Sequence, residues 1–230
     1  MRIYCEERKE TLNLTISVRV IENGQSAFKK VKELQFNALH QLPMQPRIGT
    51  YIYPEETLHF SVLNLTSFDL SVDFNSARNF IEQQVWYEKL QTYIRENILN
   101  KLNNQSYNFK FEKFYIPDSG TIEGSLTLNL KPPKNFIKNL ERIQGSIKEE
   151  LYKLNVPLQN FKIKDHDGLF GINILRFLGK KEIPIENCEK FYEYIEKENK
   201  KLSVNLKLKK FCLVISDSYL SNLNPCISHD

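Results

Sequence analysis

His59 and Ser61 are the two residues whose types and spacing best suit chemistry. They lie in residues 58–65, where β-branched and aromatic residues predict a β-strand. Because strand side chains alternate between faces, we expect His59 and Ser61 on one face and Asn64 on the other. An imidazole transfers protons near neutral pH and a hydroxyl donates to a phosphoryl oxygen, so this pair can serve one phosphate group. The alternative is a structural role, which is the commoner one for a single histidine in a strand.

Four further elements are predicted around this strand in the first half of the chain. Alternating apolar residues predict strands, and apolar residues at helical spacing predict helices. In order, they are a strand over 11–21, a helix that begins near Ser26 and ends before Pro43, a long helix over 75–103 and a strand over 107–116. A loop rich in Pro and Gly, which carries Arg47, leads into the His59 strand.

The second half of the chain repeats this order. It predicts a strand over 124–130, a helix from Pro133 to Leu154, and then a strand, a helix and a strand over 169–177, 188–200 and 204–215. A repeat of this length indicates a duplicated lobe rather than a solenoid. We therefore expect an α+β fold with βαβαβ-type lobes over 1–120 and 121–230, packed into one bilobal domain around a central cleft. In such a pair of lobes, a strand at the end of one lobe can join the sheet of the other lobe.

Matching the two halves pairs the His59 strand with residues 169–177. Gly171 then corresponds to His59, and Asn173 corresponds to Ser61. The first motif, His59-Phe60-Ser61, resembles the His-x-Thr/Ser motif of the two-histidine phosphoesterase superfamily. These LigT-like proteins include 2′-5′ RNA ligases and cyclic phosphodiesterases, and they carry one such motif in each of two α+β lobes.

The resemblance covers nearly the whole chain, but the second motif departs from the family pattern. Residues 211–215, with the following Ser216-Asp217 and Tyr219-Leu220, resemble the family's last strand and its exit. In the second lobe, Gly171-Ile172-Asn173 keeps a polar side chain at the hydroxyl position and lacks the second imidazole. The fold implied is the bilobal fold of the family, with the first motif intact and the second degenerate.

The resemblance implies metal-independent acid/base chemistry with no cofactor. One histidine acts as general base on a water or hydroxyl, the other as general acid on the leaving oxygen, and Ser/Thr donors hold the phosphoryl oxygens. His59 is then the catalytic residue, and Ser61 and Asn173 bind phosphate. The implied substrate is a phosphodiester or 2′,3′-cyclic phosphate of an RNA end or a small (oligo)nucleotide. Each positioned acid or base contributes roughly a hundred- to ten-thousand-fold. The sequence therefore leaves open a weak hydrolase and a catalytically inactive nucleotide- or RNA-binding homologue.

Four other residues are weighed for the same site, besides Tyr51, Tyr53 and Tyr115, which could reach a cleft but are commoner as packing residues. Arg47 is expected at the rim of the cleft, where a guanidinium suits phosphate, and the alternative is an exposed loop charge. His166, in an Asp-His-Asp-Gly loop, and Tyr219 are possible members, with a solvated turn and core packing as their alternatives. Regular alternation places Arg176 on the face opposite Asn173, which favours an ion pair or a surface contact over a phosphate contact.

Composition is that of a soluble globular protein. The chain has 230 residues, 41% hydrophobic and 26% charged, with a net charge of +4 that permits a polyanionic partner without requiring one. Lysines concentrate between Lys197 and Lys210 and suit either a nucleic-acid backbone or, more commonly, a solvated strand edge. A second hypothesis is therefore a protein-interaction module that uses this Lys-rich region or the helix predicted over 75–103.

Cysteine spacing and hydropathy predict the compartment. The four cysteines, at positions 5, 188, 212 and 226, form no C-x-x-C pair and have no histidine at ligand spacing. We therefore expect reduced thiols, no zinc site and no disulfide framework. Charged residues follow Met1 directly, and no run is apolar enough to span a bilayer, so a cytoplasmic protein without membrane contact is expected. We also expect a monomer.

Overall fold

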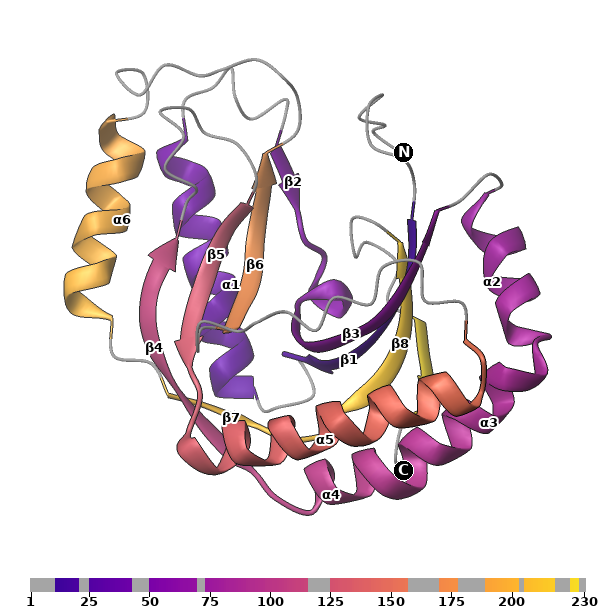
Figure 1. Ribbon diagram of the computed structural model, residues 1–230. Helices are drawn as coiled ribbons and strands as arrows, with labels where there is room; N and C mark the ends of the chain where they lie inside the picture. Colours follow the sequence, from indigo (N-terminus) through magenta and orange to yellow (C-terminus); the bar gives the residue numbers. More distant parts are fainter. Residues whose placement is uncertain are drawn as a thin grey trace.

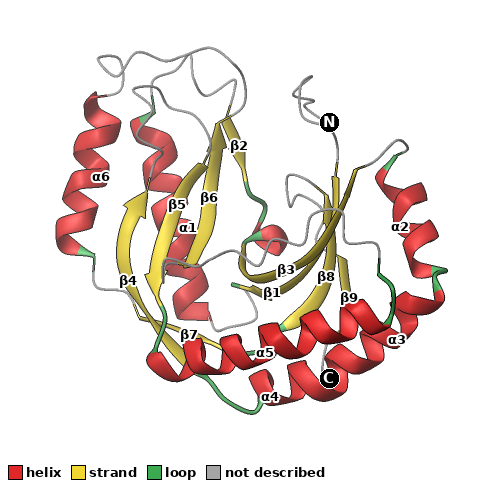
Figure 2. Cartoon of the chain, in the orientation of Figure 1, coloured by secondary structure: helices red, strands yellow, loops and turns green. Residues whose placement is uncertain are grey.

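The computed structural model describes residues 11–20, 25–42, 50–69, 73–115, 125–156, 170–177, 189–202, 205–217 and 224–227. Within these residues the strands form two antiparallel sheets, and helices lie along their outer sides (Figures 1 and 2). The predicted α+β class is confirmed.

The first sheet, here called the His59 sheet, has the strand order β3-β1-β8-β9. Its central strand β1 (Thr11–Arg19) forms because apolar residues alternate with polar ones, and the apolar side chains, such as Leu14 and Ile16, are fully buried. Helix α2 (Phe74–Glu82) packs against β1. The other strands are β3 (His59–Asp69), β8 (Cys212–Asp217) and β9 (Asn224–Ile227).

The second sheet, here called the Asn173 sheet, has the order β2-β6-β5-β4-β7. Helices α1 (Gln25–Gln41) and α6 (Glu189–Lys201) contact each other and pack against β6 and β4 of this sheet (Figure 1). Its strands are β2 (Thr50–Ile52), β4 (Tyr107–Tyr115), β5 (Ser125–Lys131), β6 (Phe170–Phe177) and β7 (Asn205–Leu208).

Each sheet takes strands from both halves of the chain. The single strand predicted over 204–215 is two strands, with β7 in the Asn173 sheet and β8 in the His59 sheet. Between them Lys210 has a φ of 60°, in the left-handed region, which turns the chain from one sheet to the other. The expected crossing of a terminal strand therefore occurs. The division near residue 120 does not coincide with a boundary between sheets, and the two lobes stay a prediction.

The long helix predicted over 75–103 is interrupted, so that prediction is wrong. Helix α2 ends at Glu82, and Gln84 has an extended backbone before α3 (Val85–Tyr93) begins. A π-helix over Ile94–Leu99 and the short α4 (Asn100–Asn103) complete the segment. Apolar spacing continues across the break because all of these segments bury one side in the same core, and periodicity alone therefore hides the interruption. Helix α5 (Lys134–Lys153) begins after Pro133, as predicted.

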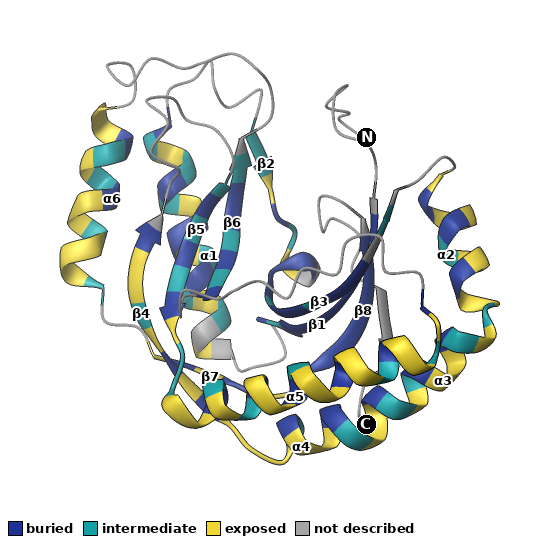
Figure 3. Ribbon diagram, in the orientation of Figure 1, coloured by how far each residue is buried: buried dark blue, intermediate teal, exposed yellow. Residues whose placement is uncertain are grey.

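A cluster of aromatic rings joins the two sheets. The ring of Phe60 in β3 lies 4.8 Å from Phe109 in β4 and 5.3 Å from Phe170 in β6, measured between centroids. Phe136 of α5, which runs beneath both sheets in the view of Figure 1, lies 5.5 Å from Phe170. Figure 3 shows the exposed residues of α5 on its outer side. Strands β3 and β6 are therefore held side by side by a packed core, and they carry the candidate site.

Two asparagines fasten helix residues to distant strand segments. Asn103, at the end of α4, donates from Nδ2 to the carbonyl of Phe211 at 3.0 Å and accepts from the Phe211 N–H at 2.6 Å. Asn199 of α6 accepts from the Phe114 N–H at 2.7 Å and donates to the Phe114 carbonyl at 3.5 Å. Both backbone groups of each phenylalanine are thus satisfied by one side chain.

Candidate functional site

His59 begins β3 and pairs in register with Arg19 of β1. The residue is only 3% exposed, and Nδ1 lies 2.7 Å from the carbonyl oxygen of Thr57. A carbonyl only accepts hydrogen bonds, so Nδ1 carries the proton and Nε2 keeps the lone pair. Burial lowers the pKa of His59, the Thr57 bond opposes this, and the Arg19 charge lowers the pKa further. His59 is therefore neutral at pH 7 and suited to accept a proton rather than to donate one.

Ser61 lies on the face of β3 that carries His59, as alternation predicts. Ser61 pairs with Ser17 of β1, two residues from the His59–Arg19 pair. Beyond it the alternation breaks at a β-bulge, and Asn64 comes opposite Thr15, whose hydroxyl donates to Asn64 Oδ1 at 3.0 Å. Asn64 therefore shares the His59 face. The prediction that it points to the other face is wrong because the bulge adds one residue to the strand.

Asn173 occupies the corresponding position in β6. It pairs with Thr127 of β5, and the Thr127 hydroxyl donates to Asn173 Oδ1 at 2.8 Å. This bond orients the amide and leaves its Nδ2 group as the donor. The predicted polar residue is thus held in a defined rotamer by its neighbour across the strand pair.

Arg176 lies on the same face as Asn173, so the prediction that placed it on the opposite face is wrong. Asn173 pairs with Thr127 and Arg176 pairs with Ser125, with a register shift between Leu126 and Thr127. Ser125 and Thr127 are two apart in β5 and share a face, and their partners therefore do so too. A second β-bulge, which adds one residue to β6, is the physical reason.

Tyr53, between β2 and β3, is fully buried near these residues. Burial raises the pKa of its phenol, while the nearby side chains of Arg176, Asn173 and Ser125 lower it, and the net direction is upward. The hydroxyl is therefore protonated at neutral pH. Among the described residues, no donor or acceptor meets its oxygen at full hydrogen-bond geometry.

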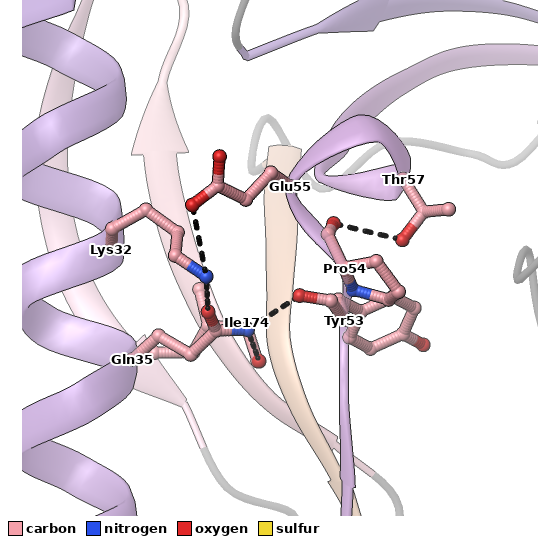
Figure 4. Close-up of polar contacts among 7 residues, drawn as sticks. All are labelled: Lys32, Gln35, Tyr53, Pro54, Glu55, Thr57 and Ile174. Carbon is pink, nitrogen blue, oxygen red and sulfur yellow. Dashed lines mark hydrogen bonds and ion pairs between the residues drawn. The ribbon is translucent and has the colours of Figure 1, made fainter.

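Gln35 of α1 holds the backbone on which this group depends. Its Nε2 donates to the carbonyl of Tyr53 at 3.0 Å and to that of Ile174 at 2.8 Å, and its side chain is buried (Figure 4). Lys32 donates to Gln35 Oε1 at 2.9 Å and lies 3.8 Å from a carboxylate oxygen of Glu55. One amide thus ties the Tyr53 segment to β6 beside its bulge.

Gly171 is closely packed at the position where the resemblance places a second histidine. A Cβ added there would lie under 3.0 Å from Thr127 Cγ2 and 3.1 Å from Asn129 Oδ1. Thr127 is held in place by its bond to Asn173, so the space is occupied by a fixed methyl group. Any side chain at this position would therefore require the packing around Thr127 to change.

Three of the predicted site residues, Arg47, His166 and Tyr219, lie outside the described residues. Of the others, the structure groups Asn173 with Tyr53 and Arg176, and His59 with Ser61 and Arg19. No hydrogen bond in the described part of the chain joins His59 to Asn173, although β3 and β6 are neighbours.

The described residues contain no group of three or more His, Cys, Asp and Glu side chains that could hold a metal ion. Nor does any helix among them reach the length and hydropathy needed to cross a membrane.

The sequence did not assign Tyr53 and Arg176 to the site. A signal was present: two consecutive apolar residues, Ile174 and Leu175, separate Asn173 from Arg176, and such a doublet breaks strand alternation. A doublet of the same kind, Val62-Leu63, separates Ser61 from Asn64. Reading each doublet as a bulge would have placed Arg176 and Asn64 correctly.

Comparisons with known proteins show the fold alone. No family model and no curated protein sequence matches the chain. The crystal structure of the conserved protein of unknown function ATU0111 from Agrobacterium tumefaciens is similar, with a TM-score of 0.60 and 10% identity over 96% of this chain and 86% of that one. The structure of TT0787 from Thermus thermophilus gives a TM-score of 0.46 with 13% identity over 88% and 87% of the two chains.

Proposed function

We propose that this is a two-histidine-phosphoesterase-like protein that binds a phosphodiester or 2′,3′-cyclic phosphate of an RNA end or small nucleotide. His59 provides acid/base chemistry without a metal. The observation that carries the proposal is the bond from His59 Nδ1 to the Thr57 carbonyl, which leaves Nε2 as a base on the face that Ser61 shares. The lowered pKa of His59 keeps this nitrogen unprotonated at neutral pH.

The duplicated architecture belongs to this proposal, and two features support it. The bulge after Ser61 in β3 has its counterpart after Asn173 in β6, at positions that the sequence repeat pairs. The clamp of Asn103 on Phe211 likewise has its counterpart in the clamp of Asn199 on a second phenylalanine. In both cases a helix of one half holds the backbone of a phenylalanine of the other half.

The proposed reaction is hydrolysis of a cyclic phosphate. His59 Nε2 takes a proton from a water molecule, the water oxygen bonds to phosphorus, and one ribose oxygen–phosphorus bond breaks. Ser61 and the Nδ2 group of Asn173 donate to the phosphoryl oxygens. With Gly171 in place of a second imidazole, the leaving ribose oxygen takes its proton from solvent. The lack of a positioned acid lowers the rate by about a hundred- to ten-thousand-fold.

Turnover of 2′,3′-cyclic nucleotides and 2′-5′-linked oligoadenylates by the purified protein tests this. His59→Gln is expected to lower the rate at least a hundredfold, because it removes the base. His40→Gln is the matched control, since His40 lies on the exposed side of α1. Equal rates for the parent and His59→Gln would remove His59 from the mechanism.

A second candidate is a homologue that keeps the fold and has lost turnover, acting as a nucleotide-binding or protein-interaction module. Two observations favour it: His59 is only 3% exposed, and the Gly171 position is closely packed. At the junction of α2 and α3, Phe80 and Val85 are 63% and 70% exposed, which suits a protein partner.

Nucleotide titration followed by the imidazole NMR signal of His59 separates these functions. A shift without turnover indicates a binding protein. A silent imidazole, with self-association in sedimentation experiments that Phe80→Ser abolishes, indicates an interaction module.

A further inference from the structure

The face of the Asn173 sheet that carries Asn173 has the chemistry of an anion site. Its described residues in β5 and β6 include no acidic side chain, and Arg176 supplies a positive charge. The remaining groups on this face are a lysine at the strand end, Lys131, and hydroxyls, amides and a glycine: Ser125, Thr127, Asn129, Gly171 and Asn173. Such a surface favours a negatively charged group over a neutral or cationic one.

Tyr53 brings a buried hydroxyl to this face. Its side chain is fully buried, and its oxygen meets no described residue at full hydrogen-bond geometry, although Arg176, Asn173 and Ser125 lie near enough to lower its pKa. A buried hydroxyl whose hydrogen-bonding capacity is not fully used costs free energy, which a hydrogen bond to a bound group would recover. Arg176, Asn173 and Ser125 lie around this hydroxyl, which therefore points into the polar group and away from the apolar core.

We propose that Tyr53, Arg176 and Ser125 form a phosphate-recognition subsite, in which the tyrosine hydroxyl donates to the anion and the guanidinium pairs with it. This inference rests on the proposed function and identifies the residues that anchor the ligand in the half of the site without an imidazole. The guanidinium offers two parallel N–H donors that match phosphate oxygens, and the hydroxyls supply further donors.

The subsite is rigidly supported from behind. Gln35 binds the carbonyl of Tyr53 and the carbonyl of Ile174, the residue at the β6 bulge that turns Arg176 onto this face. The ring of Tyr53 also packs edge-on against Tyr51, 5.1 Å away between centroids, and Tyr51 pairs in register with Arg176. A group held in this way is preorganised, which reduces the entropy lost on binding.

Calorimetric titration with inorganic phosphate and with adenosine 2′-monophosphate tests the subsite. Tyr53→Phe removes only the hydroxyl and is expected to raise Kd at least tenfold for both ligands, because hydrogen bonds to charged groups are strong. Arg176→Gln is expected to weaken binding more than Arg176→Lys, which keeps the charge and loses the fork. Acetate serves as a competing anion and is expected to bind more weakly than phosphate.

Tyr194→Phe is the matched control. It also removes a buried hydroxyl that meets no described residue at full hydrogen-bond geometry, but Tyr194 lies in α6, away from this face. Both variants are expected to keep or raise the parent's thermal unfolding midpoint, and only Tyr53→Phe is expected to lose phosphate binding. Tighter binding of acetate than phosphate would overturn the assignment to phosphate.

The outcomes separate this inference from the proposed function. Unchanged phosphate binding in Tyr53→Phe, or a parent that binds no phosphate, overturns the subsite. Phosphate binding that depends on Tyr53 and Arg176 supports the subsite even if His59→Gln leaves turnover unchanged, and in that case only the catalytic role of His59 fails. A Tyr53→Phe variant with a lowered unfolding midpoint and normal binding would show a purely structural hydroxyl.

Discussion

The packing of Gly171 against Thr127 predicts how the degenerate motif responds to a side chain. Gly171→Ala adds a Cβ that would lie under 3.0 Å from Thr127 Cγ2. Thr127 relieves this clash only by turning about χ1, which moves its hydroxyl away from Asn173 Oδ1 and loses a 2.8 Å hydrogen bond. The substitution therefore strains the core or breaks the bond that orients Asn173.

The size of the effect follows from these terms. Overpacking costs about 1–3 kcal/mol, and the lower entropy of the unfolded alanine chain offsets about 0.4–1 kcal/mol. A net loss of about 1–2 kcal/mol lowers the unfolding midpoint by about 2–8 °C in a chain of this size. Thr127→Ser keeps the hydroxyl and removes the clashing methyl, at a cost of about 0.8 kcal/mol for the lost apolar group.

A double-mutant cycle measured by urea unfolding is the assay. Because Thr127→Ser removes the atom that Gly171→Ala meets, the double variant is expected to be about as stable as Thr127→Ser alone, with a coupling energy of about 1–2 kcal/mol. Additive losses, within about 0.5 kcal/mol, would refute the packing argument.

The same cycle extends to function. Gly171→His alone is expected to give no gain in cyclic phosphodiester turnover, because the methyl of Thr127 excludes its Cβ. In the Thr127→Ser background the side chain has room at Cβ, and a gain in turnover is expected there. A gain in the parent background would show that the methyl does not block this position.

Three further predictions concern the supports of the site. The pKa of His59 is lowered in the folded protein, so the unfolded chain binds a proton at a pH at which the folded chain does not. The contribution of His59 to the unfolding free energy is therefore complete above about pH 6.5 and is lost as the pH falls. Urea unfolding from pH 8 to 5 should show this loss, and His59→Gln should reduce it. Gln35→Met leaves the buried carbonyls of Tyr53 and Ile174 without their donor and should lower the free energy of unfolding, measured in urea, by about 2–4 kcal/mol. A decrease below about 0.5 kcal/mol would contradict the role of Gln35 in holding these two carbonyls. Lys210→Gly should raise the unfolding midpoint, because glycine adopts a φ of 60° without the strain of a side chain, and a lowered midpoint would count against that account.

The order of the elements could be predicted from the sequence because it depends on local pattern. Alternation located the strands that became β1, β3 and β6, and Pro133 marked the start of α5. The interruption at Gln84 and the split of residues 204–215 were not predicted. Both depend on which sheet or which part of the core a segment packs against. This is decided by residues that are distant in the sequence, so the local pattern does not reveal it.

The faces of the site strands were predicted correctly only up to the bulges. His59 and Ser61 share a face because they precede the irregularity in β3, whereas Asn64 and Arg176 follow irregularities and were assigned to the wrong faces. One extra residue reverses the assignments beyond it until the next irregularity. Sequence alone therefore found the imidazole and missed the guanidinium, although an apolar doublet marks the bulge after Ser61 and the bulge after Asn173.

The proposed function and the subsite together suggest which part of the chemistry this chain has lost. A general acid is needed only for turnover, whereas phosphate donors are needed for any binding. The Gly171 position lacks the acid, while Tyr53 and Arg176 gather donors on the same face of the same sheet. The buried hydroxyl of Tyr53 lowers the stability of the free protein if its hydrogen-bonding capacity is not used. Binding of a ligand to this hydroxyl would explain why tyrosine is kept at this position. A protein that had become a purely structural module would gain stability from phenylalanine at this position, and for this reason the stability and phosphate affinity of Tyr53→Phe must be measured together.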